Sequence, residues 1–181
     1  RLLEDIGAMI KMKAERAGLR FRLEKDPQTA RFIKANAGKL RQIIINLLGN
    51  AVKFTREGSI SLSVRTLPMV DNPQTVTLEL TVEDSGPGIH KEHQQQIFQP
   101  FAQLQHSKTD IKGTGLGLAI CNSLVKLMGG EISLESEIDR GSRFQVHLPV
   151  ALAKKNKTDD IGSVRPSVFR LTPGQSEWRI L

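Results

Sequence analysis

The stretch from residue 36 to about residue 53 constrains the fold more than any other part of the chain. Its apolar residues occupy nearly all sides of a helix; they are Ile43, Ile44, Ile45, Leu47, Leu48, Ala51 and Val52. A helix of this kind is stable only where other elements cover it. Asn36 stands directly before it and is a suitable N-terminal cap. The sequence therefore predicts a buried central helix.

Two asparagines interrupt this apolar helix. Asn46 and Asn50 are four residues apart, so they lie one turn above the other on the same face. A buried amide without a partner costs on the order of 1–3 kcal/mol, and a single buried Asn is more often bonded to neighbouring backbone. Two of them, followed by Lys53, favour a polar ligand opposite the helix. Amide oxygens suit Mg²⁺, which takes one or two protein ligands together with substrate phosphates.

The remaining periodicities predict further helices and strands around the central helix. Helical spacing predicts an opening helix over residues 2–17, a short helical piece ending near residue 98, and a helix over 115–128. Alternation of apolar and polar residues predicts strands over 19–23, 31–35, 58–64, 76–82, 131–137 and 143–150. The third and fourth strands form a hairpin with a long connection over 68–74. Residues 99–112 have no clear period and the composition of a mobile loop.

The length of 181 residues predicts one domain with an appendage. We expect the domain over residues 1–150, a polar linker over 151–175, and a short apolar end over 176–181. The chain begins at Arg1 with no visible signal peptide, so we interpret it as a piece of a longer protein. No apolar run approaches the roughly 18–20 residues that a bilayer requires. We expect no membrane segment in this fragment.

Charge and cysteine content exclude some classes of function. The formal net charge is +7, but Lys and Arg are scattered among acidic residues, which favours a solvated surface over a nucleic-acid-binding face. The single cysteine, Cys121, cannot form an internal disulfide. This favours a reducing setting, and we predict a cytoplasmic domain, on its own or as the cytoplasmic part of a membrane-bound sensor.

Two glycine-rich segments have the composition of ligand-binding turns. Residues 84–89 place Asp84 at the end of an apolar strand, before two glycines that let the backbone approach a flat ligand. Alone, such a segment is a capped turn more often than a binding site. Residues 113–118 carry three glycines and open a helix, where backbone amides can face an anion. Their spacing matches neither a P-loop nor a dinucleotide-binding fingerprint.

Taken in chain order, residues 46–55, 84–89 and 113–118 resemble the N, G1 and G2 boxes of the catalytic and ATP-binding domain of sensor histidine kinases. Residues 98–101 resemble the F box between them. The likeness covers about residues 1–150 and includes the superfamily of gyrase and the heat-shock chaperone. It implies an α/β two-layer sandwich, the Bergerat fold. In that fold a mixed, mostly antiparallel sheet carries three helices on one face, and a mobile ATP lid closes over the site.

The resemblance also implies a role for each matching residue. Asn50 would bind Mg²⁺, Asn46 would line the same face, and Lys53 would contact phosphate; these three form the implied catalytic set. Asp84 would accept a hydrogen bond from the adenine amino group, and Gly86 and Gly88 would permit that approach. The further nucleotide contacts that the resemblance implies are Ile89, Phe101, Lys112, Gly113, Thr114, Gly115, Leu116, Gly117, Leu118 and Ser142. The implied cofactors are ATP and Mg²⁺.

Position 46 separates two kinds of reaction. Hydrolytic members of the superfamily carry a Glu there that activates water, whereas the amide of Asn46 cannot accept a proton at neutral pH. The resemblance therefore implies a protein histidine kinase that donates the γ-phosphate in two-component signal transduction. Two alternatives stay open: a nucleotide-sensing module without transfer, and a hydrolytic ATPase of the same superfamily.

The phosphoacceptor histidine has no match in this chain. The family's acceptor is followed by an acidic residue on a separate dimerisation helix, and none of His90, His93, His106 or His147 has that setting. The implied partners are therefore this dimerisation helix in the parent kinase and a response regulator or receiver domain. Residues 178–181 resemble the first strand of a receiver domain, which would make the parent a hybrid kinase. The alternative is a disordered tail.

Two positions depart from the family pattern. Asn36 stands where the family usually has Asp, although both are good helix caps. Lys112 replaces a frequent Gly before the Gly-Thr-Gly run, so it either stiffens the lid or adds a cation near the γ-phosphate. In the second case Lys112→Ala weakens ATP binding more than ADP binding. We expect the lid, about residues 98–115, to order when nucleotide binds.

Overall fold

The computed structural model describes residues 1–69, 72–102 and 114–153. In chain order the described elements are α1 (Leu2–Arg16), β1 (Arg20–Lys25), β2 (Ile33–Lys34), α2 (Ala37–Phe54), β3 (Ser59–Pro68), β4 (Thr75–Asp84), α3 (Lys91–Gln94), the 3₁₀ turn η1 (Gln96–Phe98), α4 (Gly117–Leu127), β5 (Glu131–Glu137) and β6 (Gly141–Leu152). The predicted elements are therefore all present within the described residues. The predicted lid lies mostly outside them, and the predicted linker and apolar end lie almost entirely outside them.

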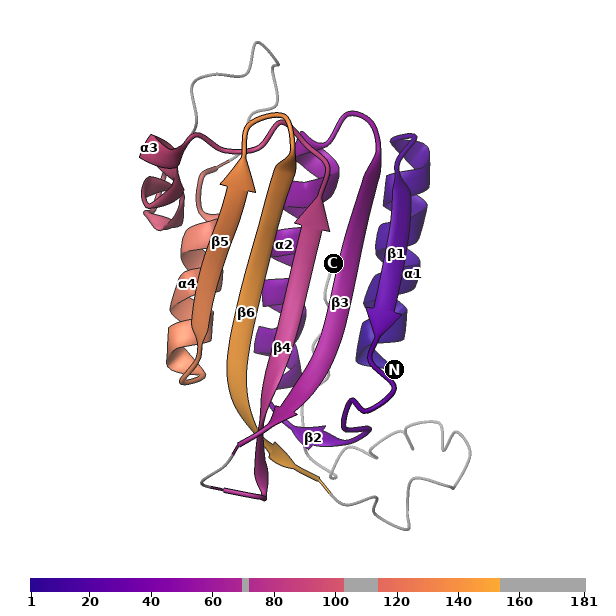
Figure 1. The fold of residues 1–181 in the computed structure, drawn as a ribbon, viewed down its shortest axis with the longest axis vertical. Helices are drawn as coiled ribbons and strands as arrows, with labels where there is room; N and C mark the ends of the chain where they lie inside the picture. The colour runs from indigo at the N-terminus through magenta and orange to yellow at the C-terminus, as the bar shows by residue number, and fades with distance from the viewer. Residues whose placement is uncertain (70–71, 103–113, 154–181) are drawn as a thin grey trace, which may run out of the picture.

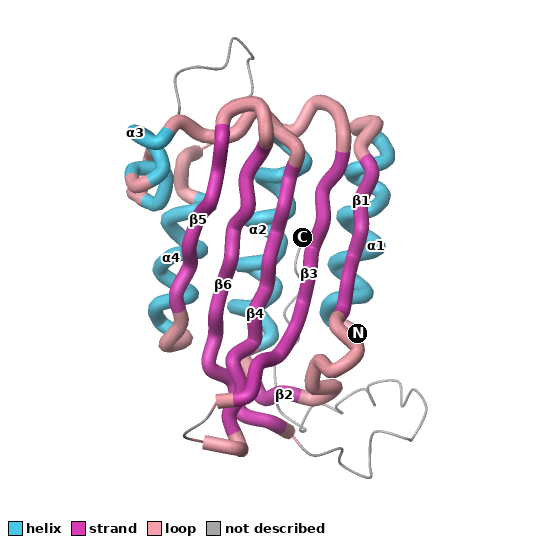
Figure 2. Tube along the Cα trace, viewed as in Figure 1, coloured by secondary structure: helices cyan, strands magenta, loops and turns pink. Residues whose placement is uncertain are grey.

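The strands form one mixed, mostly antiparallel sheet (Figures 1 and 2). Its order is β1-β3-β4-β6, and β6 then pairs with both β5 and β2. β1 runs parallel to β3, whereas the other pairs are antiparallel. The strand β6 can serve two neighbours on one side because it is 12 residues long. Its first half pairs with β5, and its last two residues pair with β2.

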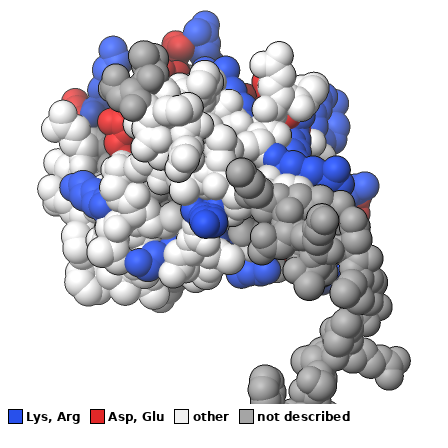
Figure 3. Space-filling model, turned by 90° about the horizontal axis from the view of Figure 1, so that it is seen from below, with Lys and Arg blue, Asp and Glu red and all other residues white. Residues whose placement is uncertain are grey.

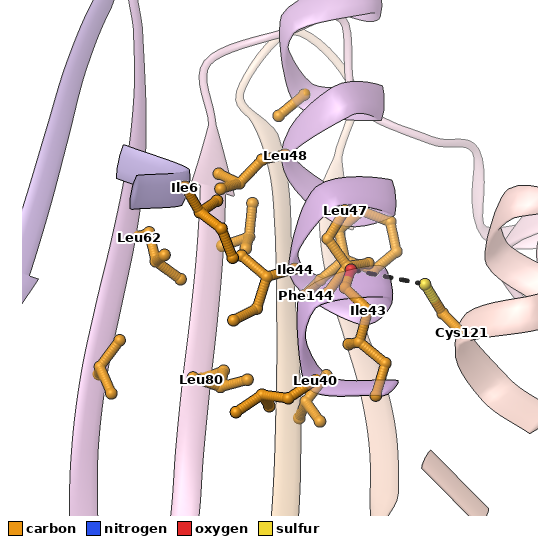
Figure 4. Packing of buried hydrophobic residues seen from close by; sticks show 14 of the residues in the cluster. Ile6, Leu40, Ile43, Ile44, Leu47, Leu48, Leu62, Leu80, Cys121 and Phe144 are labelled. Carbon is orange, nitrogen blue, oxygen red and sulfur yellow. Dashed lines mark hydrogen bonds between the residues drawn. The ribbon is translucent and has the colours of Figure 1, made fainter. Parts of the chain in front are cut away.

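Three helices, α1, α2 and α4, cover one face of the sheet, as the resemblance implied (Figure 1). The apolar residues of β3, β4 and β6 alternate toward these helices, so each strand has one buried and one polar side. The core lies between the two layers and is built largely around α2 (Figure 4). This arrangement is the two-layer α/β sandwich expected from the sequence.

The helix α2 is the centre of this core. Asn36 caps it, because its side chain accepts a hydrogen bond from the backbone N–H of Lys39 at 3.0 Å. Its fully buried side chains include Leu47 and Leu48, at 1% and 0% exposure. Beside it, α4 contributes the buried Cys121, whose thiol lies 3.7 Å from the backbone oxygen of Ile43 (Figure 4). The predicted burial of this helix is confirmed.

The other face of the sheet carries no helix among the described elements and is polar. One row of side chains crosses four strands on it, because Arg65, Glu79, His147 and Glu131 lie in register. Arg65 donates two hydrogen bonds to Glu79, at 2.7 and 3.0 Å, and Nε2 of His147 lies 3.1 Å from the same carboxylate. Glu79 is 5% exposed, so these contacts compensate a buried charge.

The lower end of the molecule, where β2 lies, shows Lys and Arg at several separate places with uncharged surface between them (Figure 3). Within the described residues, the helices fall short of the length and apolarity that crossing a bilayer takes. Across residues 1–69, 72–102 and 114–153, no group of three or more His, Cys, Asp or Glu side chains is placed to hold a metal ion.

Candidate functional site

Asp84 ends β4 at the upper edge of the sheet in Figure 1 and is half-buried. Its Oδ1 accepts a hydrogen bond from the backbone N–H of Gly86 at 2.9 Å. The backbone N–H of Ser142, opposite on β6, also bonds to this carboxylate. Burial raises the pKa of Asp84 above its usual value, and the two backbone donors oppose that rise. Asp84 is therefore a fixed hydrogen-bond acceptor in a partly desolvated position.

Glycines surround Asp84 because the backbone approaches itself closely there. Gly88 has φ +71°, and a side chain on it would collide with the backbone oxygen of Glu137. Gly141 has φ +99°, and a side chain on it would collide with the backbone oxygen of Asp84. Gly86 is buried beside the carboxylate. The turn that follows β4 thus depends on glycine for its path.

A network of polar side chains holds this turn against β5 and β6. The hydroxyl of Ser136 accepts from the N–H of Ile89 at 2.8 Å, donates to the backbone oxygen of Gly141 at 2.8 Å, and lies 3.1 Å from the hydroxyl of Ser142. The side chain of Gln94 donates to the backbone oxygens of Ile89 and Ser136. The sequence analysis assigned no role to Ser136 or Gln94. Ser136 carried a signal, since it takes an inward position in line with Ile132 and Leu134.

The paired asparagines lie on the side of α2 that faces α4, and both are partly buried. The side chain of Asn46 donates to the backbone oxygen of Gly117, the first residue of α4, at 3.3 Å. Its oxygen accepts from Gln42 at 3.1 Å. The amide nitrogen of Asn50 lies 4.0 Å from where a Cβ on Gly117 would stand. Gly117 and Asn50 are therefore neighbours across the contact between α4 and α2.

The side-chain amide of Asn50 has no hydrogen-bond partner among the described residues. Lys53 lies one turn further along α2 and is half-buried. Its ammonium group stands 4.8 Å from the ring centroid of Phe54. An amide and an ammonium group thus remain available at the end of α2 nearest Asp84.

The residues before α4 form the third part of the site. The backbone N–H of Phe101 donates to the oxygen of Gly115 at 3.1 Å, so the two ends of the predicted lid meet here. The N–H of Leu116 bonds to the hydroxyl of the exposed Thr114 at 3.4 Å. Phe101 is 72% exposed, and Leu118 is partly buried against the core. Lys112 and Gly113 lie outside the described residues.

Asn46, Asn50 and Gly117 thus lie together, and Asp84, Gly86, Gly88, Ile89 and Ser142 form a second group at the same end of the sandwich. Thr55 is a residue that the sequence analysis gave no role. It ends α2, is 4% exposed, and its hydroxyl is the one buried side-chain polar atom of the described residues without a hydrogen-bond partner.

Comparison with known proteins places this geometry in context. The family described as histidine kinase-, DNA gyrase B-, and HSP90-like ATPase matches residues 35–152. The sensor histidine kinase AruS of Pseudomonas aeruginosa is 39% identical over 153 residues, which are 84% of this chain and 15% of that protein. The aerobic respiration control sensor protein ArcB of Escherichia coli is 36% identical over 151 residues, 81% of this chain and 19% of that protein. The chain thus spans less than a fifth of these relatives.

Among solved structures, full-length ShkA in complex with AMPPNP superimposes with a TM-score of 0.72 and 30% identity. The match covers 85% of this chain and 30% of that one. The AMPPNP in that structure is an analogue of ATP.

Proposed function

The chain belongs to the histidine kinase-, DNA gyrase B- and HSP90-like ATPase family, and we propose that it binds Mg-ATP and donates the γ-phosphate to a histidine. The acceptor would lie on a separate dimerisation helix of the longer protein. The placement of Asn46 and Asn50 carries this proposal, because both amides lie on the α2 face that meets the start of α4. Asp84 lies at the same end of the sandwich, ready to accept from a base.

The donor set near Asn50 fits a magnesium ion. The amide oxygen of Asn50 is a hard ligand, and this ion commonly takes one protein ligand with the rest supplied by phosphate and water. Lys53 would contact the phosphates as a point charge. The bound ion would neutralise phosphate charge. We propose further nucleotide contacts at Ile89, Phe101, Thr114, Leu116, Leu118 and Ser142, with Lys112 and the glycines at 113, 115 and 117 near the phosphates.

Transfer is favoured over hydrolysis because the side chain at position 46 is an amide. In the transfer, a ring nitrogen of the acceptor histidine attacks the γ-phosphorus and forms an N–P bond. The bond from that phosphorus to the β,γ-bridging oxygen breaks, and ADP leaves. The residues of this chain position the nucleotide and stabilise its charge. Asn46 donates a hydrogen bond to the backbone oxygen of Gly117, so its side chain contacts the start of α4.

The partners and setting follow from the same proposal. The parent kinase would supply the dimerisation helix, and a response regulator or receiver domain would take the phosphate onward. A receiver domain starting near residue 176 would make the parent a hybrid kinase. We propose a cytoplasmic location, where ATP is available.

Calorimetric titration with ATP, ADP and GTP, with and without Mg²⁺, tests the binding step. We expect Mg²⁺-dependent binding of ATP in preference to GTP, and loss of the Mg²⁺ dependence in Asn50→Ala. Gln145→Ala removes an amide from the opposite face of the sheet and serves as the matched control. Binding without adenine preference, or an Asn50→Ala variant that keeps its Mg²⁺ dependence, would show that the residue assignment is wrong.

Labelled ATP distinguishes transfer from the alternatives. A longer chain that includes the dimerisation helix should form phosphohistidine, and the fragment alone should hydrolyse ATP very slowly. Bound but intact ATP with the longer chain would instead indicate a nucleotide-sensing module. Turnover by the fragment at ordinary ATPase rates would indicate a hydrolytic enzyme.

A further inference from the structure

Thr55 has a buried hydroxyl that lacks a partner among the described residues. An unpaired buried hydroxyl costs on the order of 1–3 kcal/mol, and a valine of the same shape would avoid this cost. The backbone of Thr55 is regular, since the residue caps the C-terminal end of α2 and its N–H bonds to the oxygen of Ala51 at 3.0 Å. A threonine at this position therefore requires a reason beyond the fold of the unliganded chain.

The hydroxyl of Thr55 lies close to Gly86, beside the carboxylate of Asp84. A Cβ built on Gly86 would stand 2.7 Å from Oδ1 of Asp84, 3.3 Å from Oγ1 of Thr55 and 3.5 Å from the backbone oxygen of Phe54. Thr55 and Asp84 thus approach the same point from two elements, α2 and β4. The absence of a side chain at Gly86 leaves the space between them open.

Because the hydroxyl is closed off from solvent, it acts on a ligand only through a neighbour. Two acceptors lie with it around the open point at Gly86, the backbone oxygen of Phe54 and the carboxylate of Asp84, and of these only the carboxylate belongs to the proposed nucleotide site. Asp84 already accepts from the backbone groups of Gly86 and Ser142. A carboxylate can accept about four hydrogen bonds, so Asp84 has room for a further donor.

We infer that Thr55 is a positioning residue for Asp84: its hydroxyl bonds to the carboxylate when a base engages the other oxygen. This inference rests on the proposed function, since it concerns the acid that selects adenine. It assigns to α2 a part in base recognition in addition to the phosphate end of the site. Thr55, after α2, and Ser142, on β6, then hold Asp84 together.

Other charged groups near Asp84 also influence its ionisation in a pH test. Glu83 on β4, Glu135 and Glu137 on β5, Arg140 in the following turn and Arg143 on β6 line one hollow with it. On β3 its partner in register is the uncharged Ile60, and the charged residues nearest in sequence to Thr55 are Lys53 on α2 and Arg56 and Glu57 after it. Thr55→Val changes none of these groups.

The test compares ATP binding by Thr55→Val, Thr55→Ser and the wild-type chain across pH 4–8. The hydroxyl bonds to Asp84 only in the complex, so Thr55→Val makes the carboxyl harder to ionise in the ATP complex and leaves the free chain unchanged. We expect Thr55→Val to weaken ATP binding about 3- to 10-fold at pH 7. We also expect the acidic midpoint, which is the pH at which Asp84 takes up a proton in the ATP complex, to move upward by about half a unit or more. Thr55→Ser should restore both values.

Thr81→Val is the matched control, because Thr81 is also 4% exposed but lies on the helix-free side of the sheet. It should leave the affinity and the midpoint unchanged. Thermal unfolding of Thr55→Val should occur at the wild-type temperature or above it, since the variant removes an unpaired hydroxyl. An unchanged pH midpoint in a folded Thr55→Val variant overturns the inference and leaves the proposed function intact.

If Thr55→Val does not fold, the inference can still be tested by NMR on the wild-type chain. With ¹³C-methyl threonine, the Thr55 signal should shift on addition of ATP and stay unchanged with tripolyphosphate, which has no base. A Thr55 signal that does not shift when ATP is added overturns the inference. Failure of the wild-type chain to bind ATP at all overturns the proposed function and this inference with it.

Discussion

At the scale of single residues, stability and the proposed function oppose each other at Asp84. Burial raises the pKa of this carboxyl, so its negative charge costs stability at neutral pH. A group whose pKa is raised on folding contributes stability at low pH, and that contribution disappears as pH rises through the folded pKa. The chain keeps the charge because the turn at Gly86 and the strand β6 supply donors to hold it. Such a cost is typical of a binding residue.

Asp84→Asn should therefore separate the two properties. We expect ATP binding to weaken about 10- to 100-fold, because the amide no longer offers two acceptor oxygens to the donors around it. The unfolding temperature at pH 7 should stay the same or rise, and the difference from wild type should vanish well below the ordinary Asp pKa of 3.8. Calorimetric titration and thermal unfolding at pH 3 and pH 7 give both values. A variant that loses stability at pH 7 would show that Asp84 has a structural role instead.

At the scale of elements, α2 contributes more buried side chains to the core than the other described helices do. Leu48 is 0% exposed and lies in the core between α2 and the sheet (Figure 4). Leu48→Ala should lower the free energy of unfolding by about 2–5 kcal/mol, because it leaves a cavity. Leu127→Ala is the control, since Leu127 is 68% exposed on α4, and it should change stability by less than about 0.5 kcal/mol. Urea denaturation measures both, and equal losses would contradict the assignment of α2 as the central helix.

The helix-free side of the sheet offers a second comparison between matched arginines. Burial raises the pKa of Glu79, but hydrogen bonds from Arg65 and His147 outweigh it and hold the pKa below the usual value. Arg143 instead contacts Glu83 and Glu135, which are both well exposed. Arg65→Ala should therefore lower the unfolding temperature more than Arg143→Ala, because it removes two donors from a buried carboxylate.

The pH dependence of this comparison has a definite sign. A carboxyl whose pKa is lowered on folding contributes stability above its ordinary pKa, here 4.5, and loses it as pH falls. The gap between wild type and Arg65→Ala should thus be full at pH 7 and shrink below about pH 4.5. Thermal unfolding at pH 3.5 and pH 7 measures the gap. A gap that grows on acidification would mean that Glu79 is not the group responsible.

At the scale of the whole molecule, the sequence predicted the elements better than their pairing. Periodicity identified α2, the β3–β4 hairpin and the strands β5 and β6, because each has its own apolar pattern. It did not predict the parallel pairing of β1 with β3 or the two neighbours of β6, since such contacts join distant segments. In the site, the glycines and Asp84 were visible as a motif. Thr55 was not, because a missing hydrogen bond appears only in three dimensions.

The two ends of the chain should differ in their importance for folding. A chain starting at residue 31 lacks α1 and β1, whose side chains Ile6, Ile10 and Ala14 are 0% exposed. We expect it to unfold at a much lower temperature or to aggregate, because the core between α1 and α2 would be open. A chain ending at residue 153 should unfold at the wild-type temperature, since the sequence predicts a linker beyond 150. Calorimetric unfolding of the two truncated chains decides both points.

The position of Cys121 makes the native chain suitable for thiol labelling. Cys121 is 0% exposed with its sulfur against the backbone of α2, and burial raises its pKa to about 11, so folded molecules should react slowly with maleimides. A cysteine introduced at a surface position, such as Ser133, would then accept a dye selectively. The slow modification of Cys121 itself would report how often α4 separates from α2, and adding a nucleotide would show whether a bound ligand restrains that separation.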